Sequence, residues 1–329
     1  MACALAALAL ASCAGAGAGP STNATHSLPP ARPAATACGP AAQATVAAVD
    51  ATVAEHIYAN ELAGDEVSSD IAHVTGAADL RKAVAADNLV AAFAAARRIV
   101  FHPAWHIVHL QVFDTAGKLL ADFGGAYVIA PVAGVLRSGS RTIGRFLMSV
   151  QDDTGETKLE TRFVGNPVAI YLSSGFLVAD RYATFPPATP PGPTLTIGAT
   201  RYAVVRQTFE AFPSGALVEV MLVPPPALPL AKLSCAAVRA QEFGRVALRL
   251  AALATDLPKQ YPAYAATVAI YTGADVFVRS GGRLLGTSGG AGPAQPPTSG
   301  TISYLGRTWL VFSASPLPPA RIYLLIPPS

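Results

Sequence analysis

Ser288 lies in a sequence motif that could support nucleophilic catalysis. The segment Gly286-Thr287-Ser288-Gly289-Gly290 matches G-x-S-x-G, the pattern of a nucleophile elbow. An elbow needs a strand before the serine and a helix after it, and in hydrolases of that fold the catalytic histidine follows the serine. Here AGPAQPPTSG follows, which cannot form a helix, and the last histidine of the chain is His109. We therefore interpret the match as a glycine-rich hairpin loop.

Three histidines, His102, His106 and His109, form the pattern H-x3-H-x2-H. On one helix such spacing could bring imidazoles together around zinc. However, Pro103 and the alternating apolar pattern place them at a junction between a helix and a strand. His106 and His109 are three residues apart on the expected strand, so their side chains face opposite sides. The sequence therefore predicts no metal site and favours partly buried or surface histidines.

Asp152 and Asp153 could act as the paired carboxyls of a glycoside hydrolase. Adjacent acids at the end of a strand point apart, so we expect them to cap a short helix that runs through Lys158 and Phe163. With these three patterns set aside, the sequence predicts a protein that is not an enzyme and has no cofactor.

The composition narrows the class of protein. Hydrophobic residues make up 52% of the 329 residues and charged residues 13%, which excludes a disordered chain. The net charge is +3 without a block of Lys and Arg, so no nucleic-acid partner is expected. After the first residues, no run reaches the roughly 18–20 apolar residues that span a bilayer. The best candidate, residues 127–136, contains Pro131 and Gly134 and predicts a buried strand and turn.

The N-terminal segment predicts where the protein is located. Residues 5–11 are apolar, and Leu10-Ala11-Ser12-Cys13 resembles the bacterial lipobox. The resemblance implies that residues 1–12 are a signal peptide and that the sulfur of Cys13 carries a diacylglycerol. Residues 13–37, rich in Gly, Ala, Ser, Thr and Pro, are expected to be a flexible tether. The protein would then lie outside the cytoplasm, anchored by lipid to the outer face of the cell membrane. The alternative is an alanine-rich segment with an incidental cysteine.

The chain has four cysteines. If Cys3 leaves with the signal peptide and Cys13 is lipidated, Cys38 and Cys235 remain in an oxidising compartment. We predict a disulfide between them that closes a loop of about 200 residues. The alternative is two buried free thiols. No C-x-x-C motif is present, so zinc ribbons and thioredoxin-like chemistry are not supported.

A helical pattern follows each of these two cysteines. The first helix has one apolar face formed by Val46, Val49, Val53 and Ile57. The second has an apolar face formed by Phe243, Val246, Leu250, Leu253 and Leu257, and Pro258 is expected to end it.

An internal similarity divides the chain. VAIY at 168–171 recurs at 268–271, and residues 213–225 resemble residues 316–328 in length, flanking prolines and apolar centre. We interpret this as a duplicated strand-loop-strand-strand unit, with chance similarity between two hairpins as the alternative. It predicts a first lobe at residues 38–225 and a smaller, related helix-plus-sheet lobe at 226–329.

The first lobe contains further elements. The patterns predict a helix over Asp79–Arg98, a strand over His106–Phe113, a turn at Asp114–Gly117, a returning strand over Lys118–Phe123 and a strand over Thr142–Gln151. The stretches VFDTAGKLLADFGG and GRFLMSVQDDTGETKL, placed after a long N-terminal helix, resemble the extracellular Cache sensor domains, which are PAS-like folds. The resemblance covers roughly residues 40–225 and implies an α+β lobe with a mostly antiparallel sheet. Cache sensors usually feed a kinase or chemoreceptor inside the cell, whereas this chain is expected to signal only through a membrane partner.

A Cache-like lobe implies a cleft between its sheet and flanking segments, where a few polar groups on an apolar wall bind a small solute. The residues that could supply these groups are Tyr127, Arg145, Ser149, Gln151, Arg162 and Tyr171. An arginine there would favour a carboxylate ligand. As alternatives, Arg145 would be a solvated strand residue and Tyr171 a core residue.

Together, these patterns predict a lipid-anchored extracytoplasmic sensor or binding protein that recognises a small solute or a membrane partner without catalysis. A structural or interaction role in the cell envelope, without a small ligand, is the first alternative, and a hydrolase with an unrecognised site is the second.

Overall fold

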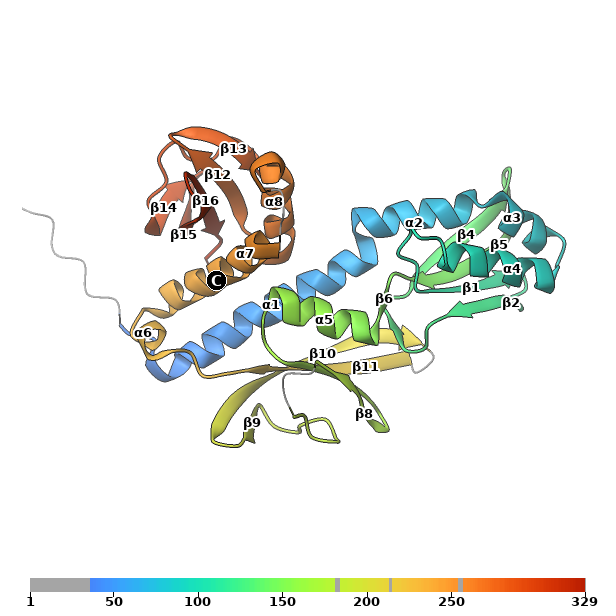
Figure 1. Ribbon diagram of the computed structural model, residues 1–329, viewed down its shortest axis with the longest axis horizontal. Helices are drawn as coiled ribbons and strands as arrows, with labels where there is room; N and C mark the ends of the chain where they lie inside the picture. Colours follow the sequence, from blue (N-terminus) through green and yellow to red (C-terminus); the bar gives the residue numbers. More distant parts are fainter. Residues whose placement is uncertain (1–35, 181–183, 213–214, 254–256, 329) are drawn as a thin grey trace, which may run out of the picture. The chain divides into compact units, whose positions relative to one another are not determined.

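The structure, a computed structural model, describes residues 36–180, 184–212, 215–253 and 257–328 (Figure 1). Within these ranges the predicted combination of helices and antiparallel sheets is confirmed, with three separate sheets. The predicted signal peptide, the lipobox with Cys13 and most of the tether lie outside the described residues. Among the helices of the described part, none has both the length and the apolar character needed to cross a membrane.

The long helix predicted after Cys38 is α1 (Ala42–Ala63), which follows the short 3-10 helix η1 (Gly39–Ala41). Its predicted apolar face is buried: Val46, Val49, Val53 and Ile57. α1 contacts α7 (Cys235–Leu253), α8 (Leu257–Thr272) and β10 (Thr200–Phe212). The largest core of the chain forms around these contacts, so α1 connects the second sheet with the helices of the third.

The first sheet is antiparallel and has the order β2-β1-β5-β4. Its strands are β1 (His109–Asp114), β2 (Leu119–Gly124), β4 (Val132–Ser138) and β5 (Arg141–Ser149). The predicted turn between β1 and β2 is confirmed. Asp114 Oδ1 accepts hydrogen bonds from the backbone N–H groups of Ala116 and Lys118, each at 2.8 Å. These local bonds explain why the sequence alone identifies this hairpin.

Three helices pack against the first sheet: α2 (Asp65–Gly76), α3 (Ala78–Ala85) and α4 (Leu89–Val100). The expectation of one helix over residues 79–98 is wrong, because α3 and α4 are separate helices. Asp87 breaks the helical path with a φ of 50°. Asn88 then caps α4, its Oδ1 accepting from the backbone N–H of Ala91 at 3.0 Å.

The second sheet contains five strands in the order β8-β7-β11-β10-β9, extended by two short strands. The five are β7 (Val168–Leu172), β8 (Gly175–Ala179), β9 (Thr194–Ile197), β10 and β11 (Gly215–Val223). β3 (Val128–Ile129) pairs with the far end of β10, and β6 (Gln151–Asp152) pairs with β3. In the chain, β3 lies between β2 and β4, and β6 directly follows β5, so segments next to strands of the first sheet take part in the second.

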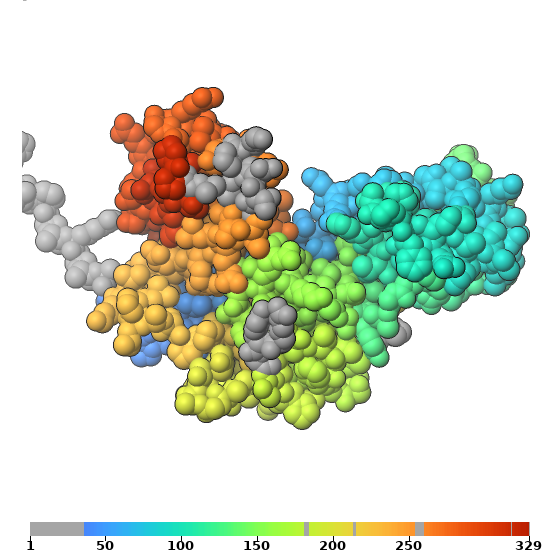
Figure 2. Space-filling view, viewed as in Figure 1, coloured from blue at the N-terminus to red at the C-terminus, as the bar shows by residue number. Residues whose placement is uncertain are grey.

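The helix predicted after Asp152 is α5 (Asp153–Phe163), and its predicted cap is confirmed. Asp152 Oδ1 accepts from the backbone N–H of Gly155 at 2.6 Å. α5 packs on β7 and β8 and contacts α7, so the green surface of α5 meets the orange surface of α7 in Figure 2.

The third sheet has the order β13-β12-β16-β15-β14. Its strands are β12 (Asp275–Ser280), β13 (Arg283–Thr287), β14 (Ser299–Tyr304), β15 (Arg307–Leu317) and β16 (Ala320–Ile326). α6 (Leu228–Ala231), α7 and α8 precede it, and α7 and α8 pack against its strands. Of the residues that the sequence predicts for the apolar face of the second helix, Phe243, Val246 and Leu250 are buried there. The rest of that prediction is wrong, because Leu253 is exposed at the end of α7, and Leu257 and Pro258 belong to α8.

The second and third sheets share one strand order. When the strands of each are numbered from its own first strand, leaving out the two short strands of the second sheet, both run 2-1-5-4-3, whereas the four strands of the first sheet run 2-1-4-3. β11 and β16 both take the fifth place, and they lie within the two similar stretches at 213–225 and 316–328. The strand interpretation of the second VAIY is wrong, because residues 268–271 lie in α8. The strand that corresponds to β7 is β12.

The predicted disulfide between Cys38 and Cys235 is present, with a Cα–Cα distance of 4.7 Å and a sequence separation of 197. It joins the residue before η1 to the first residue of α7. The backbone N–H of Cys38 also donates to the carbonyl of Leu233 at 2.7 Å. The start of the folded chain is thus fixed to the start of the last helix–sheet unit.

Candidate ligand-binding cleft

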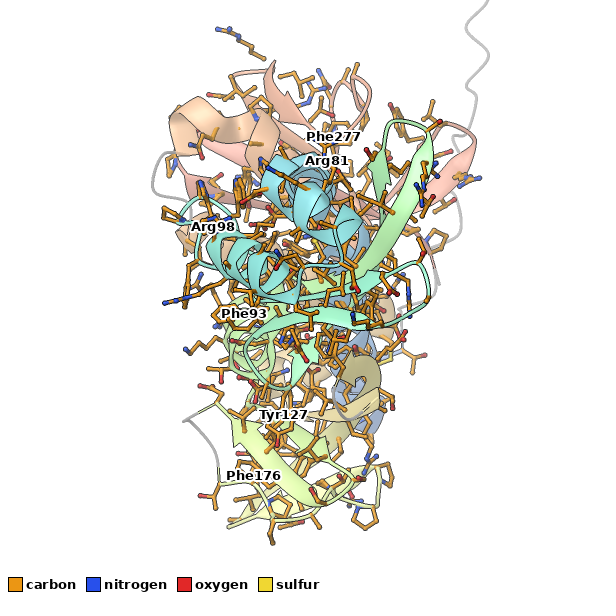
Figure 3. All side chains as sticks on the ribbon, turned by 90° about the vertical axis from the view of Figure 1, so that its right-hand side faces the viewer. Arg81, Phe93, Arg98, Tyr127, Phe176 and Phe277 are labelled. Carbon is orange, nitrogen blue, oxygen red and sulfur yellow. A yellow bond between two sulfur atoms is a disulfide. The ribbon has the colours of Figure 1, made fainter. Side chains whose placement is uncertain are left out.

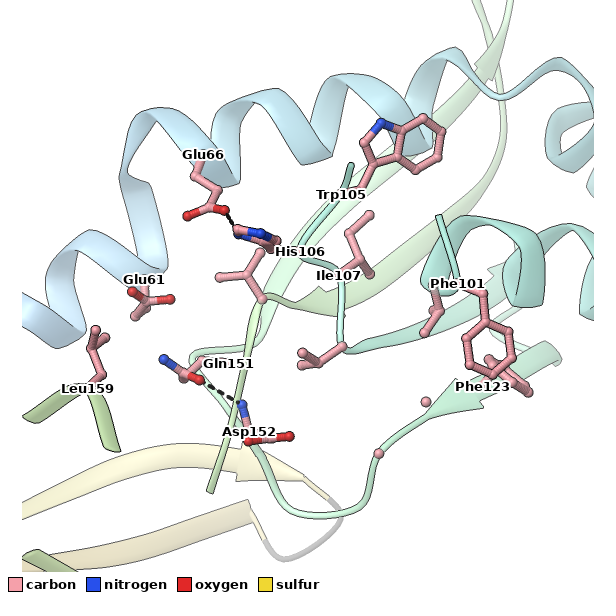
Figure 4. Close-up of a pocket in the computed structure, with 15 residues that line it drawn as sticks. Glu61, Glu66, Phe101, Trp105, His106, Ile107, Phe123, Gln151, Asp152 and Leu159 are labelled. Atoms are coloured by element: carbon pink, nitrogen blue, oxygen red, sulfur yellow. Dashed lines mark hydrogen bonds and ion pairs between the residues drawn. The ribbon is translucent and has the colours of Figure 1, made fainter. Parts of the chain in front are cut away.

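A cleft of about 840 Å³ opens where the first sheet meets α1, α2 and α5 (Figure 4). Its lining comes from the end of α1, the start of α2, the segment after α4, the end of β2, β6 and α5. The volume lies within the range of small-molecule sites, roughly 300–1,000 Å³. Figure 4 shows Glu61, Glu66 and Gln151 on one side and the aromatic rings on the other.

The aromatic side is formed by Phe101, Trp105 and Phe123. The rings of Phe101 and Phe123 meet edge to face, with centroids 5.3 Å apart. The indole of Trp105 stacks against two imidazoles, those of His73 at 4.4 Å and His102 at 3.9 Å. These ring contacts hold the aromatic side in a defined orientation.

The bend between α1 and α2 positions the acidic side. Gly64 has an extended backbone, with φ −69° and ψ 171°, and both helices meet at it. A Cβ at this position would lie 2.7 Å from the backbone carbonyl oxygen of Asn60, so the close approach requires glycine. Glu61 before the bend and Glu66 after it both reach the cleft (Figure 4).

The cleft is electrostatically negative. Its lining includes the carboxyls of Glu61, Glu66 and Asp152, and within the described residues it includes no Lys or Arg. Burial raises the pKa of Glu61 above its usual value. Glu66 forms an ion pair with His106, and both side chains are more than half exposed. Exposed ion pairs contribute little to stability, so Glu66 can exchange this partner for a ligand at small cost.

One of the six residues predicted to bind a ligand, Gln151, lines the cleft, and a second, Ser149, lies behind it. The side-chain oxygen of Gln151 accepts from the backbone N–H of Asp152 at 3.2 Å. Ser149 is fully buried; its Oγ donates to backbone carbonyls, including that of Gln151 at 2.9 Å, and accepts from the N–H of Gln151 at 3.1 Å. Ser149 therefore positions Gln151.

The other four predicted residues lie apart from the cleft lining. Tyr127, labelled in Figure 3, precedes β3 with a φ of 54°, and its carbonyl accepts from the N–H of Asp153. Arg145 is exposed on β5, its guanidinium 4.5 Å from the ring centroid of Phe113. Arg162 is exposed in the last turn of α5.

Tyr171 is a core residue. It is fully buried in the second sheet, and its hydroxyl donates to the carbonyl of Pro186 at 3.0 Å. Burial raises the pKa of Tyr171 to about 12. This placement agrees with the core alternative for Tyr171.

The serine and the histidines that the sequence suggests for catalysis each interact with different residues and do not form one site. Ser288 Oγ accepts from the backbone N–H of Val276 at 2.9 Å, and β14 is the next element that follows it. His102 stacks on Trp105, His106 pairs with Glu66, and His109 Nε2 lies 2.6 Å from Asp122 Oδ1. The three histidines thus have different partners.

Most of the cleft could not be located from sequence patterns. Glu61, Glu66 and Trp105 stand in no motif, and only the fold brings them near Gln151. The one sequence feature that pointed to the cleft was the order of elements, which places Gln151 and Asp152 between a strand and a helix.

The fold and the cleft together define a class: a mixed helix and sheet protein with antiparallel sheets and an acidic, aromatic-lined cleft of ligand size. A scan against protein-family models finds no match, and a search of curated proteins finds none either.

Proposed function

We propose that this protein is a lipid-anchored extracytoplasmic binding protein of the Cache/PAS-like type, which recognises a small organic cation without catalysis and passes its bound state to a membrane partner. The observation that carries the proposal is the cleft, where carboxyls and aromatic rings face one space. The carboxylate ligand expected at an arginine is not favoured, because Arg145 and Arg162 lie outside the lining.

The chemistry of the lining favours an amine or a quaternary ammonium group. Carboxylates attract a cation over several ångströms, and more strongly in a recessed site where water is partly excluded. Aromatic faces add a cation–π contribution of about 0.5–2 kcal/mol. Apolar residues of the lining, such as Ile107 and Leu159, would contact the carbon atoms of the solute.

The antiparallel sheets support the Cache/PAS-like type, which implies an α+β lobe with a mostly antiparallel sheet. The second and third sheets share the order 2-1-5-4-3, as expected if the two lobes are related. The long α1 ahead of the sheets agrees with the N-terminal helix of Cache sensors.

Substituting Glu61 tests the site. We expect Glu61→Gln to weaken binding of the cation about 10- to 100-fold, because a hydrogen bond to a charged group is worth about 1.5–3 kcal/mol. The probes are choline, putrescine and arginine, with succinate and acetate as anionic counterparts, and the measurements are thermal shift and calorimetric titration of the full chain. Since burial raises the pKa of Glu61, wild-type affinity should fall as the pH is lowered through that pKa. The Gln variant should lack this part of the pH dependence.

Glu55→Gln is the matched control, because Glu55 is exposed on the same helix and outside the cleft. It should leave the affinity for the cation unchanged. If no cation among the probes raises the melting temperature of the wild-type chain, the binding role fails, and the structural role without a small ligand becomes the better explanation.

Substituting Cys13 tests the anchor. We expect Cys13→Ser to move the protein from the membrane fraction to the soluble extracytoplasmic fraction and to abolish incorporation of radiolabelled palmitate, because the thiol is the lipid acceptor implied by the lipobox. The control is Cys38→Ser, which should keep the label. Palmitate incorporation that survives Cys13→Ser would contradict the lipoprotein assignment.

A further inference from the structure

Three glutamates meet in the interior next to the cleft. Glu156 and Glu160 lie four residues apart on α5, so they share the helix face that packs on the second sheet. Glu219 comes from β11, in the middle of that sheet, and pairs in register with Ile170. The exposures of these side chains are 0%, 0% and 1%. One carboxylate oxygen from each lies within 4.8 Å of the other two.

Five of the six carboxyl oxygens of this cluster lack a hydrogen-bond partner within the described residues. Both oxygens of Glu156, both of Glu160 and Oε2 of Glu219 are buried without a partner among the residues that the structure describes. Buried polar atoms almost always have a partner in native proteins, and each orphaned one costs about 1–3 kcal/mol. The carboxyls of Glu156 and Glu160, both fully buried and without a partner, therefore lie around the same small space as that of Glu219. A group that interacts with these oxygens is needed there.

The surrounding charges are negative. The charged groups that act on the three glutamates are Asp50, Glu61 and the three carboxyls themselves. Burial first, and these neighbours second, raise the pKa of each carboxyl in the cluster. The nearby cation, Arg245, is already bonded to Asp50 and Glu242.

We propose that Glu156, Glu160 and Glu219 bind one divalent cation of the hard, oxygen-preferring class, with Ca²⁺ as the best candidate. Such ions take carboxylate oxygens at about 2.3–2.6 Å for Ca²⁺, so two ligands on opposite sides of the ion lie about 5 Å apart. The oxygens lie within 4.8 Å of one another, so one Ca²⁺ can reach all three. Mg²⁺ demands near-ideal octahedral geometry and usually keeps several waters, which a fully buried cluster of three carboxyls does not favour. All-oxygen ligands do not favour zinc or copper.

A cation bound by these glutamates would link α5 to the second sheet, next to α1. Its ligands come from α5 and β11, and its neighbour Asp50 comes from α1. Glu61, whose charge acts on Glu156, also lines the cleft, so the cluster lies directly behind the cleft wall. The site is a structural one, and its existence does not depend on which solute the cleft binds.

The test uses the purified full chain after treatment with EDTA and dialysis. We expect one equivalent of Ca²⁺ to bind in a calorimetric titration with CaCl₂ and to raise the melting temperature by several degrees, because a ligand that binds only the native state stabilises it. Titrations with MgCl₂ and MnCl₂ should give weaker binding. Glu160→Gln should weaken Ca²⁺ binding at least 100-fold, and without metal its melting temperature should equal or exceed that of the wild type, because a buried charge is removed.

Two further variants keep the test decisive. Glu156→Gln should repeat the result if Glu160→Gln folds poorly, and Glu55→Gln, exposed on α1, should keep the full Ca²⁺ response. If the EDTA-treated wild type binds none of the three cations and melts at the same temperature with and without CaCl₂, shared protons rather than a metal occupy the cluster, and the proposal is wrong.

Discussion

Replacing both Cys38 and Cys235 by serine should lower the melting temperature of the full chain by about 5–15 °C. The disulfide closes a loop between residues 197 apart, and in the chain-entropy model so long a loop corresponds to about 5 kcal/mol. Removing a native disulfide from a small domain costs about 2–5 kcal/mol in practice. For a chain of this size each kcal/mol corresponds to about 2–4 °C, which gives the expected range.

The position of the disulfide explains why its effect should be large. Cys38 is buried, and its partner begins α7, so the bond joins the two helices whose packing forms the main core. Thermal unfolding is measured by circular dichroism with and without dithiothreitol. The reductant should lower the melting temperature of the wild type to that of the double variant and should leave the double variant unchanged. Equal melting temperatures for wild type and variant under oxidising conditions would show that core packing alone holds the two helices together.

Local sequence patterns correctly predicted the structural elements that depend on interactions between residues close together in the sequence. The apolar spacing of α1, the Asp114 turn and the Asp152 cap all depend on residues within a few positions of one another. The break between α3 and α4 was also local, because Asn88 is a typical N-cap residue, yet the apolar spacing continues across it.

The two VAIY segments show that the same four residues can form a strand in one place and a helix in another, so local sequence alone does not determine their structure. At 168–171 every side chain is fully buried, because β7 lies inside the second sheet. At 268–271 Val268 is fully buried while Ile270 is 51% exposed, as on one side of a helix. Identical residues take different structures because tertiary contacts outweigh intrinsic propensity in short apolar runs.

The buried acids carried a sequence signal, whereas most residues of the cleft did not. Glu219 interrupts the apolar run ALVEVMLV, and Asp50 follows Val49 on the apolar face of α1. A charged residue inside such a pattern predicts a buried charge with a specific partner. The cleft joins residues from Glu61 to Leu159 through contacts between separate elements, and no spacing rule predicts such a meeting.

Replacing Arg245 by methionine should destabilise the chain by about 3 kcal/mol. The Arg245 guanidinium donates to Glu242 Oε1 from Nε at 2.6 Å and to Asp50 Oδ1 from a terminal nitrogen at 3.3 Å, and it also bonds the carbonyl of Val164. The exposures of the Asp50 and Glu242 side chains are 0% and 5%. Removing one partner of a buried ion pair costs about 3–5 kcal/mol, because a buried charge is left uncompensated. Since the Arg245 side chain is 35% exposed, we expect the lower end of that range.

Arg249 provides the matched control for this substitution. It lies one turn further along α7, and its guanidinium donates to the carbonyls of Thr161 and Arg162. Arg249→Met should therefore cost about 1 kcal/mol, the value of an ordinary hydrogen bond, when both variants are compared by urea unfolding. Adding Asp50→Asn and Glu242→Gln to Arg245→Met should restore part of the lost stability, because the uncompensated charges are then absent. Equal costs for the two arginine variants would mean that removing Arg245 leaves no uncompensated charge in the interior. In that case the contribution of Arg245 comes from its packing and its bond to Val164 alone.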